Sequence, residues 1–187
     1  MKKYLENNCN VRQLIPSEFD RVIDYFLKSD KNYLQTLGTD INKLPSKGDW
    51  YNFMATEYQK SFTEKKYFCL GWQYEQQLIG HSAMDNINYG QEARIHLHIW
   101  EPLMRNKGLG SRFLSLSIAY YFEQFALQRI ICTPKATNTP PNKTLSKVGF
   151  EFLGPLETVP HPICFKQIVN QYILERNDFI KIQENSN

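Results

Sequence analysis

The stretch HLHIWEPLMRNKGLGSRFL, residues 96–114, decides how the chain folds. Residues 93–100 alternate between two sets of side chains, which is typical of a β-strand. Apolar residues then recur with a helical period through residues 108–128. Gly108 and Gly110 stand where the strand pattern changes to the helix pattern. The stretch therefore predicts a strand, a glycine turn and a long helix.

The glycine turn predicts an anion-binding site. The first turn of a helix carries backbone N–H groups without intrahelical partners, together with the positive end of the helix dipole. Glycine lets the backbone approach a diphosphate closely, and Arg105 and Lys107 add positive charge. The stretch matches neither the mononucleotide pattern G-x-x-x-x-G-K-[ST] nor the dinucleotide pattern G-x-G-x-x-G. The alternative is a solvated basic helix face whose glycine serves packing alone.

The charge distribution favours the same region. Residues 105–147 contain seven basic residues and one acidic residue, Glu123, while the whole chain carries only +3. A basic segment within a slightly acidic remainder suits a polyphosphate cofactor at one end of a site and a cationic substrate at the other. A nucleic-acid-binding protein would show a larger excess of basic residues, so we expect no nucleic acid partner.

The composition indicates a soluble globular protein. Hydrophobic residues make up 42%, charged residues 22%, and the mean hydropathy is −0.50. Residues 1–12 lack the apolar core of an export signal, and no apolar run is long enough to cross a bilayer. Four scattered cysteines without a C-x-x-C pair are typical of free thiols in a reducing compartment: Cys9, Cys69, Cys132 and Cys164. We expect one cytoplasmic domain with no membrane partner.

Working outward from the glycine turn, the patterns on both sides predict more strands and helices. The expected strands are residues 11–15, 67–74, 78–87, 93–100, 129–132, 150–153 and 162–172. The expected helices cover residues 19–27 with Ser17 as N-cap, a short segment ending at Gly38, residues 50–57 opened by Ser46, residues 108–128 and residues 140–147. This order predicts an α/β (α+β) fold around a mixed sheet.

Two motifs resemble those of the GCN5-related N-acetyltransferase (GNAT) family. Residues 105–110 are similar to its motif A, R/Q-x-x-G-x-G/A, and residues 138–150 to its N-x-P-x-x-x-x-L-x-K-x-G-F run. Uncharacterised bacterial members share the H-L-H-[IL]-W strand. The resemblance spans residues 10–173 as a single N-acetyltransferase domain, leaving 1–9 and 174–187 as terminal extensions. It implies a mostly antiparallel central sheet with helices on both faces.

The resemblance implies an acyltransferase that uses acetyl-CoA as co-substrate. The acetyl group would pass to a primary amine of a small molecule or peptide by direct attack on the thioester, without a covalent enzyme intermediate. The pyrophosphate would lie on residues 105–110 and the pantetheine arm along the preceding strand. The implied cofactor-binding residues are Ile99, Trp100, Arg105, Asn106, Lys107, Gly108, Leu109, Gly110, Asn138 and Lys143.

One position departs from the family pattern. Many members carry a tyrosine, the general acid to the thiolate, where this chain has Leu145. The proton donor is therefore unidentified, and a non-catalytic acyl-CoA-binding domain remains an alternative. The sequence specifies neither the amine acceptor nor the oligomeric state, for which a homodimer is one option.

The histidines supply the candidate base. One face of the strand at 93–100 carries Glu92, Arg94, His96, His98 and Trp100. A histidine can deprotonate an ammonium group near neutral pH, and His98 lies nearest the cofactor end. His96 and Glu92 are further candidates for the catalytic role, and His81, with Asp85 on the neighbouring strand, is a weaker one. His161 belongs to a proline-flanked loop that could border the acceptor. The alternative is that these histidines are hydrogen-bonded core residues.

Metal binding is the alternative function, of a different class from acetyl transfer. Five residues nearly match the cupin pattern G-x5-H-x-H-x3,4-E-x6-G: Gly90, His96, His98, Glu101 and Gly108. Only two residues separate His98 from Glu101, and a helix is expected where a cupin needs a strand. We therefore expect no bound metal.

Overall fold

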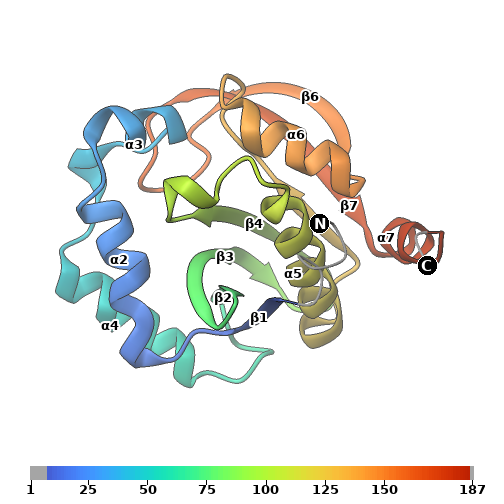
Figure 1. The fold of residues 1–187 in the computed structure, drawn as a ribbon, viewed down its shortest axis with the longest axis horizontal. Coiled ribbons are helices and arrows are strands. Elements are labelled where there is room, and N and C mark those ends of the chain that lie inside the picture. Colours follow the sequence, from blue (N-terminus) through green and yellow to red (C-terminus); the bar gives the residue numbers. More distant parts are fainter. Residues whose placement is uncertain (1–7, 186–187) are drawn as a thin grey trace.

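In the computed structural model, which describes residues 8–185, seven strands form one mixed sheet (Figure 1). The strands are β1 (Cys9–Gln13), β2 (Tyr67–Tyr74), β3 (Gln77–Asn88), β4 (Glu92–Ile99), β5 (Arg129–Cys132), β6 (Glu151–Thr158) and β7 (Gln167–Glu175). Their order across the sheet is β1-β2-β3-β4-β5-β7-β6. Neighbours run antiparallel except for the parallel pair β4 and β5. The predicted fold class is confirmed.

Helices cover both faces of the sheet. They are α2 (Phe19–Leu27), α3 (Lys31–Leu37), α4 (Lys47–Gln59), α5 (Leu109–Phe125), α6 (Thr139–Val148) and α7 (Arg176–Glu184), with 3₁₀ turns η1 (Pro16–Glu18), η2 (Ile41–Lys43) and η3 (Pro102–Met104). Residues of α2, α3 and α4 share one core cluster with Trp100, whereas α5, α6 and α7 share another with Ile95. Figure 1 shows α2 and α4 on one side and α5 and α7 on the other.

The N-terminal helices begin and end mostly as expected. Ser46 accepts a hydrogen bond from the Asp49 N–H at 3.1 Å, and Gly38 ends α3 in the left-handed conformation. The prediction for Ser17 is wrong, because this residue lies inside η1 and Glu18 precedes α2. The Glu18 carboxylate accepts the Ile15 N–H at 3.1 Å, which is the role of the third residue in a capping box around η1.

Helix α5 packs in the core of the molecule, because its apolar face is continuous. Phe113, Leu114 and Ile118 are completely buried. The ring of Phe113 stacks on that of Trp72, with centroids 5.2 Å apart and planes 8° apart. The Trp72 indole N–H finds a partner in the Ser117 hydroxyl at 2.9 Å, so this tryptophan leaves no donor unpaired in the core. Truncating Phe113 to alanine would cost about 3–5 kcal/mol.

The C-terminal helix α7 was not expected from the sequence. It lies within residues 174–187, the segment predicted to be a terminal extension. Phe179 is nevertheless buried and packs on Phe122, with ring centroids 5.7 Å apart. A helix with few apolar residues has a weak periodic signal, so its one buried aromatic residue was not recognised.

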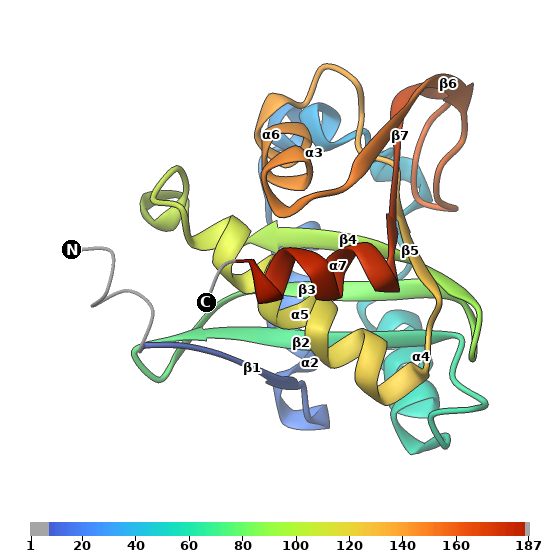
Figure 2. The same cartoon turned by 90° about the vertical axis from the view of Figure 1, so that its right-hand side faces the viewer.

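Strands β4 and β5 diverge where the functional site forms. They pair only between residues 92–94 and 129–131, although β4 continues to Ile99. Figure 2 shows β5 and β7 turning away from β4. Within residues 8–185, no other strand replaces β5 beside residues 95–99 of β4. A gap of this kind exposes backbone and side chains in the middle of a sheet.

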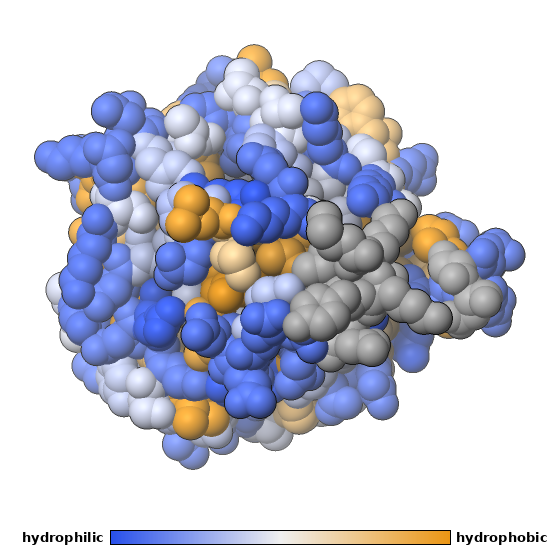
Figure 3. Space-filling model, viewed as in Figure 1, coloured by the Kyte–Doolittle hydropathy of each residue, from blue (hydrophilic) through white to orange (hydrophobic). Residues whose placement is uncertain are grey.

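The face shown in Figure 3 is mostly hydrophilic, with hydrophobic residues gathered in a hollow near its centre. Among the helices of the described residues, none is both long and apolar enough to cross a bilayer.

Candidate active site

Two cavities meet beside the diverging end of β4. The first, about 400 Å³, lies against the glycine turn and includes Ile99, Gly108 and Gly110 in its lining; we call it the glycine-turn cavity. The second, about 870 Å³, contains all four histidines, and we call it the histidine cavity. His98 and Asn138 line both cavities. A ligand in one cavity can therefore contact a ligand in the other beside these two side chains.

The glycine turn gives the first cavity its shape. Gly108 has a φ of 79°, in the left-handed region, and precedes the first residue of α5. A Cβ atom built on Gly110 would have Thr144 Oγ1 as its nearest neighbour, at 3.7 Å. The protein itself therefore leaves room at Gly110, and that room adjoins the N-terminus of α5. This is the geometry of an anion site at a helix start.

Positive side chains surround this turn. Arg105 and Lys143 line the glycine-turn cavity, and no carboxylate of the described residues does so. The Arg105 guanidinium donates to the carbonyl oxygens of Ile99 at 3.1 Å and Trp100 at 3.3 Å. It also lies over the Tyr33 ring, 4.6 Å from its centroid. The turn is thus held in place while the cavity keeps its positive charge.

Most of the predicted cofactor-binding residues gather in this cavity. Those that line it are Ile99, Arg105, Asn106, Gly108, Gly110, Asn138 and Lys143. The other three lie elsewhere: the side chain of Leu109 packs in the core beside Phe113, Lys107 is exposed outside the lining, and Trp100 is buried beneath α2. Their side chains point away because neighbours in a turn or strand cannot all face one cavity.

The histidine cavity has apolar walls and a polar floor. Phe26, Trp50 and Phe53 contribute aromatic surface from α2 and α4. Residues 160–163, the loop before β7, form a further wall. The ionisable groups in the lining are balanced, because Asp49 and Asp85 stand against two lysines: Lys66 and Lys135. The cavity offers one large apolar space with charges of both signs at its edges.

His98 and His81 form a stacked pair at the junction. Their ring centroids are 4.9 Å apart with planes 21° apart. The Trp100 indole N–H donates to Nδ1 of His81 at 2.8 Å, so His81 carries its proton on Nε2. Burial, with an added electrostatic contribution from His96, lowers the pKa of His81 to about 3. Burial, His81, His96 and Arg105 together place the pKa of His98 well below its usual value. Both rings are therefore neutral near pH 7.

Two tyrosines continue from His98 into the glycine-turn cavity. The Tyr25 hydroxyl lies 3.3 Å from Nδ1 of His98 and 2.8 Å from the Tyr33 hydroxyl. Both tyrosines line the glycine-turn cavity. Burial, with an added contribution from Tyr33, raises the pKa of Tyr25 well above its usual value, so its hydroxyl stays protonated. No sequence motif marks these two residues, which come from the N-terminal helices α2 and α3, so the sequence analysis did not identify them.

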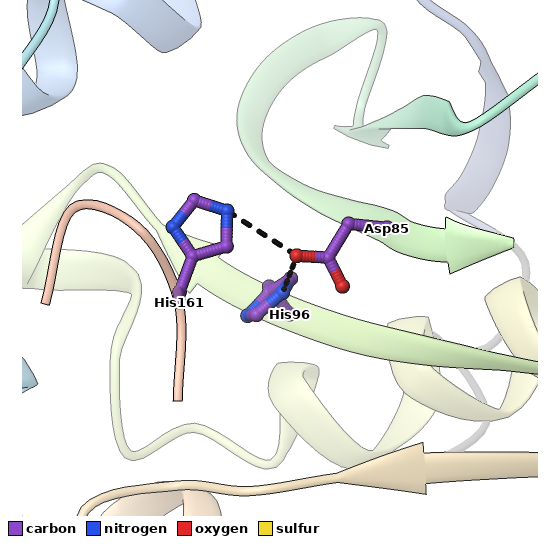
Figure 4. A group of neighbouring side chains, drawn as sticks. All are labelled: Asp85, His96 and His161. Carbon is purple, nitrogen blue, oxygen red and sulfur yellow. Dashed lines mark ion pairs between the residues drawn. The ribbon is translucent and has the colours of Figure 1, made fainter. Parts of the chain in front are cut away.

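A second polar cluster lies farther along the floor of the histidine cavity (Figure 4). The Asp85 carboxylate accepts two bonds from Arg94, Nε at 2.7 Å and Nη2 at 2.6 Å. Nε2 of His96 and Nε2 of His161 both point at the same Asp85 oxygen, each 3.2 Å away. Burial favours the neutral acid, but His96 and Arg94 outweigh it and hold the pKa of Asp85 well below its ordinary value.

The hydrogen bonds of this cluster favour an ion-pair network over a metal centre. Nδ1 of His161 accepts the Ile163 N–H at 3.3 Å, so Nε2 carries the proton and faces Asp85 as a donor. A metal ligand would need that Nε2 lone pair, and Arg94 already neutralises the carboxylate. Geometrically, the ligand atoms of Asp85, His96 and His161 do lie within 4.8 Å of one another. Nε2 of His96 is buried and faces the Asp85 carboxylate oxygen at 3.2 Å.

The cupin-like trio does not come together. His98 contacts Tyr25 and His81, whereas His96 lies beside Asp85, and Glu101 is exposed at the start of η3. The near match in spacing does not form a shared site, because β4 ends at Ile99 and Glu101 lies beyond it, before η3.

Two further positions differ from expectation. Glu92 lies at the opposite end of β4 from His98, about 20 Å along the strand, and lines neither cavity. Leu145 is completely buried in the core under the sheet and also lines neither cavity. The place where many family members carry a tyrosine therefore holds no proton donor here.

Comparison with known proteins gives one family match. Residues 10–151 match the family model described as an acetyltransferase (GNAT) domain. No curated protein sequence matches the chain.

Three solved structures show the same fold at low sequence identity. The aminoglycoside acetyltransferase AAC(6')-Ib, in complex with coenzyme A, has a TM-score of 0.72 and 13% identity over 94% of this chain and 99% of that one. The spermidine N-acetyltransferase from Vibrio cholerae, in complex with CoA and spermine, has a TM-score of 0.73 and 16% identity over 93% and 99%. A ribosomal L7/L12 alpha-N-protein acetyltransferase in complex with coenzyme A has a TM-score of 0.74 and 13% identity over 91% and 96%.

Proposed function

The chain belongs to the GNAT acetyltransferase family, and from this premise we propose that it transfers an acetyl group to a primary amine held in the histidine cavity. It is an N-acetyltransferase with acetyl-CoA as its co-substrate. The observation that supports the proposal is that two cavities of different chemistry meet at His98. Donor and acceptor can be held separately and still react at one point.

The glycine-turn cavity fits coenzyme A. The N-terminus of α5 and the space at Gly110 suit the pyrophosphate, and Arg105 and Lys143 add charge of the right sign. Asn138, which lines both cavities, is placed to hold the pantetheine arm. Acetyl-CoA supplies the acetyl group as an activated thioester. Three neighbours of the same fold were crystallised with coenzyme A or CoA, which agrees with this assignment.

The acceptor amine attacks the thioester directly. The thiols that line the histidine cavity are Cys132 and Cys164. Burial raises the pKa of Cys132 to about 12 and that of Cys164 to about 11, so both are protonated and weakly nucleophilic. Neither thiol suits a covalent acetyl-enzyme step, and a single transfer from sulfur to nitrogen is the simpler route.

His98 is the residue that accepts the proton from the attacking amine. It is neutral at pH 7 and so has a free lone pair on one ring nitrogen, and it lines the cavity of the acceptor as well as that of the cofactor. A positioned base contributes about a hundredfold or more to the rate. His96 lies two residues away on the same face, beside Asp85 instead of the cofactor cavity, and binds or orients the acceptor.

The lining charges indicate which amines fit. A polyamine needs several unpaired carboxylates, but Asp85 is already paired with Arg94, and Asp49 is the other carboxylate of the lining, beside two lysines. Aromatic walls from Phe26, Trp50 and Phe53 suit an apolar body. The preferred acceptor is therefore a monoamine with an apolar, aromatic-sized body.

A thiol-release assay with acetyl-CoA and a panel of amines tests this function. We expect aromatic monoamines such as phenethylamine to react about tenfold faster, as kcat/KM, than spermidine or kanamycin. His98→Gln should lower kcat about a hundredfold while calorimetry shows unchanged acetyl-CoA affinity. Tyr120→Phe, at a residue that lines neither cavity, serves as control. Binding of acetyl-CoA without turnover of any amine would instead favour a non-catalytic acyl-CoA-binding domain.

A further inference from the structure

We propose that His98, Tyr25 and Tyr33 form a proton wire between the two cavities, with Tyr33 as the group that protonates the departing CoA thiolate. The proposal rests on the acetyl transfer proposed above and adds the residue that completes it. The buried Leu145 leaves that role without an occupant at its usual place.

The contacts form an unbroken chain from one cavity to the other. Nδ1 of His98 lies 3.3 Å from the Tyr25 hydroxyl, which lies 2.8 Å from the Tyr33 hydroxyl. His98 lines both cavities, and the tyrosines line only the glycine-turn cavity. Tyr25 is buried and Tyr33 is partly exposed, so the chain begins inside the protein and ends at a surface that coenzyme A would cover.

The hydrogen atoms can be assigned consistently along this chain. If Nδ1 of His98 carries the proton, it donates to the Tyr25 oxygen, and Tyr25 donates to the Tyr33 oxygen. This leaves Nε2 of His98 as a free acceptor and the Tyr33 proton as a free donor. Both unused positions are those that the reaction needs, one for the amine and one for the thiolate.

The transfer then balances. A neutral amine forms a nitrogen–carbon bond to the acetyl carbon, and the carbon–sulfur bond breaks with its electron pair left on sulfur. The amine gives one proton to Nε2 of His98, Nδ1 passes its proton to Tyr25, Tyr25 passes its own to Tyr33, and Tyr33 gives one to sulfur. Each residue ends with the number of protons that it had, and His98 is left as its other tautomer, which exchange with water restores.

The electrostatics explain why the proton must move on rather than rest on a wire residue. His98 is surrounded by His81, His96 and Arg105, which disfavour an imidazolium. Tyr25 is buried, which disfavours a phenolate. At the far end, Arg105 lies over the Tyr33 ring at 4.6 Å, and its positive charge stabilises the negative charge that develops there as the proton leaves.

Other hydroxyls of the glycine-turn cavity are worse placed. Thr36 donates to the Tyr33 carbonyl at 2.6 Å, and Thr144 to the Pro140 carbonyl at 3.0 Å, so their protons are already used. Ser111 lies in the first turn of α5, beside the expected pyrophosphate and away from His98. The Tyr33 hydroxyl, by contrast, is linked through Tyr25 to His98, the proposed base.

The experiment compares Tyr33→Phe and Tyr25→Phe with the wild type, using acetyl-CoA and its selenoester analogue. Both variants keep the ring and lose only the hydroxyl, so we expect kcat with acetyl-CoA to fall about a hundredfold with unchanged acetyl-CoA affinity. A selenol is a much stronger acid than a thiol and leaves without a proton. The loss in Tyr33→Phe should therefore shrink to less than about threefold with the selenoester.

The double variant supplies a second readout. If the tyrosines act as one unit, Tyr25→Phe combined with Tyr33→Phe should lose no more activity than either single change. Tyr120→Phe is the matched control, because Tyr120 stacks on Phe68 in the core and lines neither cavity. It should retain wild-type kcat with both esters.

The outcomes separate the wire from the transfer itself. Wild-type turnover that survives in Tyr33→Phe, or a loss of equal size with the thioester and the selenoester, overturns the wire and leaves the acetyltransferase function standing. No turnover by the wild type with any amine of the panel overturns the proposed function and the wire with it.

Discussion

The two cavities that meet at His98 are assembled in different ways. The glycine-turn cavity takes its glycines and Arg105 from one short stretch, residues 105–110, that links β4 to α5, and Lys143 joins them from α6. The histidine cavity combines α2, α4, β3, β4 and the loop at 160–163. One contact in it, from the Arg94 guanidinium to the Pro160 carbonyl, joins residues 66 apart in the sequence. Local sequence can specify the first kind of site, and only the folded chain can specify the second.

The two cavities also differ in their chemistry. The glycine-turn cavity relies on backbone N–H groups and on cations without opposing carboxylates. The histidine cavity relies on side chains that hold one another in position, with Asp85 bound to Arg94 and facing His96 and His161. Changes in the first cavity should therefore act on cofactor binding, and changes in the second on the acceptor and on pH dependence.

The largest effect is expected at the glycine turn. Gly110→Asp places a negative charge beside the diphosphate, and we expect acetyl-CoA affinity to fall roughly a hundredfold or more. Gly110→Asn is the control, because it fills the same space beside Thr144 without adding negative charge. Calorimetry with acetyl-CoA measures both. Equal affinity of Gly110→Asp and wild type would mean that the diphosphate binds elsewhere.

The next largest effect is expected on the pH dependence of the free energy of unfolding, and it arises from the histidine cavity. His81 has a pKa of about 3 in the folded protein and an ordinary value of 6.5 when unfolded. Below pH 6.5 the unfolded chain binds a proton that the folded chain does not, so the free energy of unfolding falls by about 1.4 kcal/mol per pH unit. His161, with a folded pKa of about 4, adds to this loss.

Urea unfolding at several values between pH 7.5 and pH 4.5 checks this. The free energy of unfolding should be level above pH 6.5, apart from other groups, and should fall below it. In His81→Phe, the slope of the free energy of unfolding against pH should be smaller by the contribution of one histidine, whatever the absolute stability of the variant. An unchanged slope would show that His81 is protonated in the folded protein.

A smaller effect is expected from His161, which lies in the wall of the histidine cavity. His161→Ala removes one donor to Asp85 and loosens the wall, so we expect KM for the amine to rise about fivefold, with acetyl-CoA affinity unchanged. Steady-state kinetics with the best amine of the panel measures KM, and calorimetry measures the cofactor. A matching loss of acetyl-CoA affinity would show that the two cavities are not independent.

The smallest effect on turnover is expected from removing metal ions. Because Arg94 holds Asp85 and the His161 Nε2 carries a proton, chelation should leave turnover unchanged. Dialysis against EDTA followed by the thiol-release assay tests this, with elemental analysis of the untreated protein. Near-stoichiometric zinc, lost in His96→Ala, would make Asp85, His96 and His161 a metal site.

The parts that could be predicted from the sequence are those with local causes. Periodicity placed β2, β3, β4 and α5, because each buries one face along a continuous stretch. Glycines at Gly38 and Gly108 marked the places where the chain adopts a positive φ. The signal failed at Ser17, which lies inside η1 instead of capping α2, and at α7, where Phe179 is the buried residue.

Within the candidate active site, sequence patterns were sufficient to predict the glycine turn at residues 105–110 and the shared strand face of His96 and His98. Backbone N–H groups and strand alternation depend on neighbours along the chain, so a short stretch is sufficient. The tertiary structure alone decided that His98 would contact Tyr25 and that His96 would face Asp85. These contacts depend on how distant helices and strands pack, and packing is set by the whole core at once.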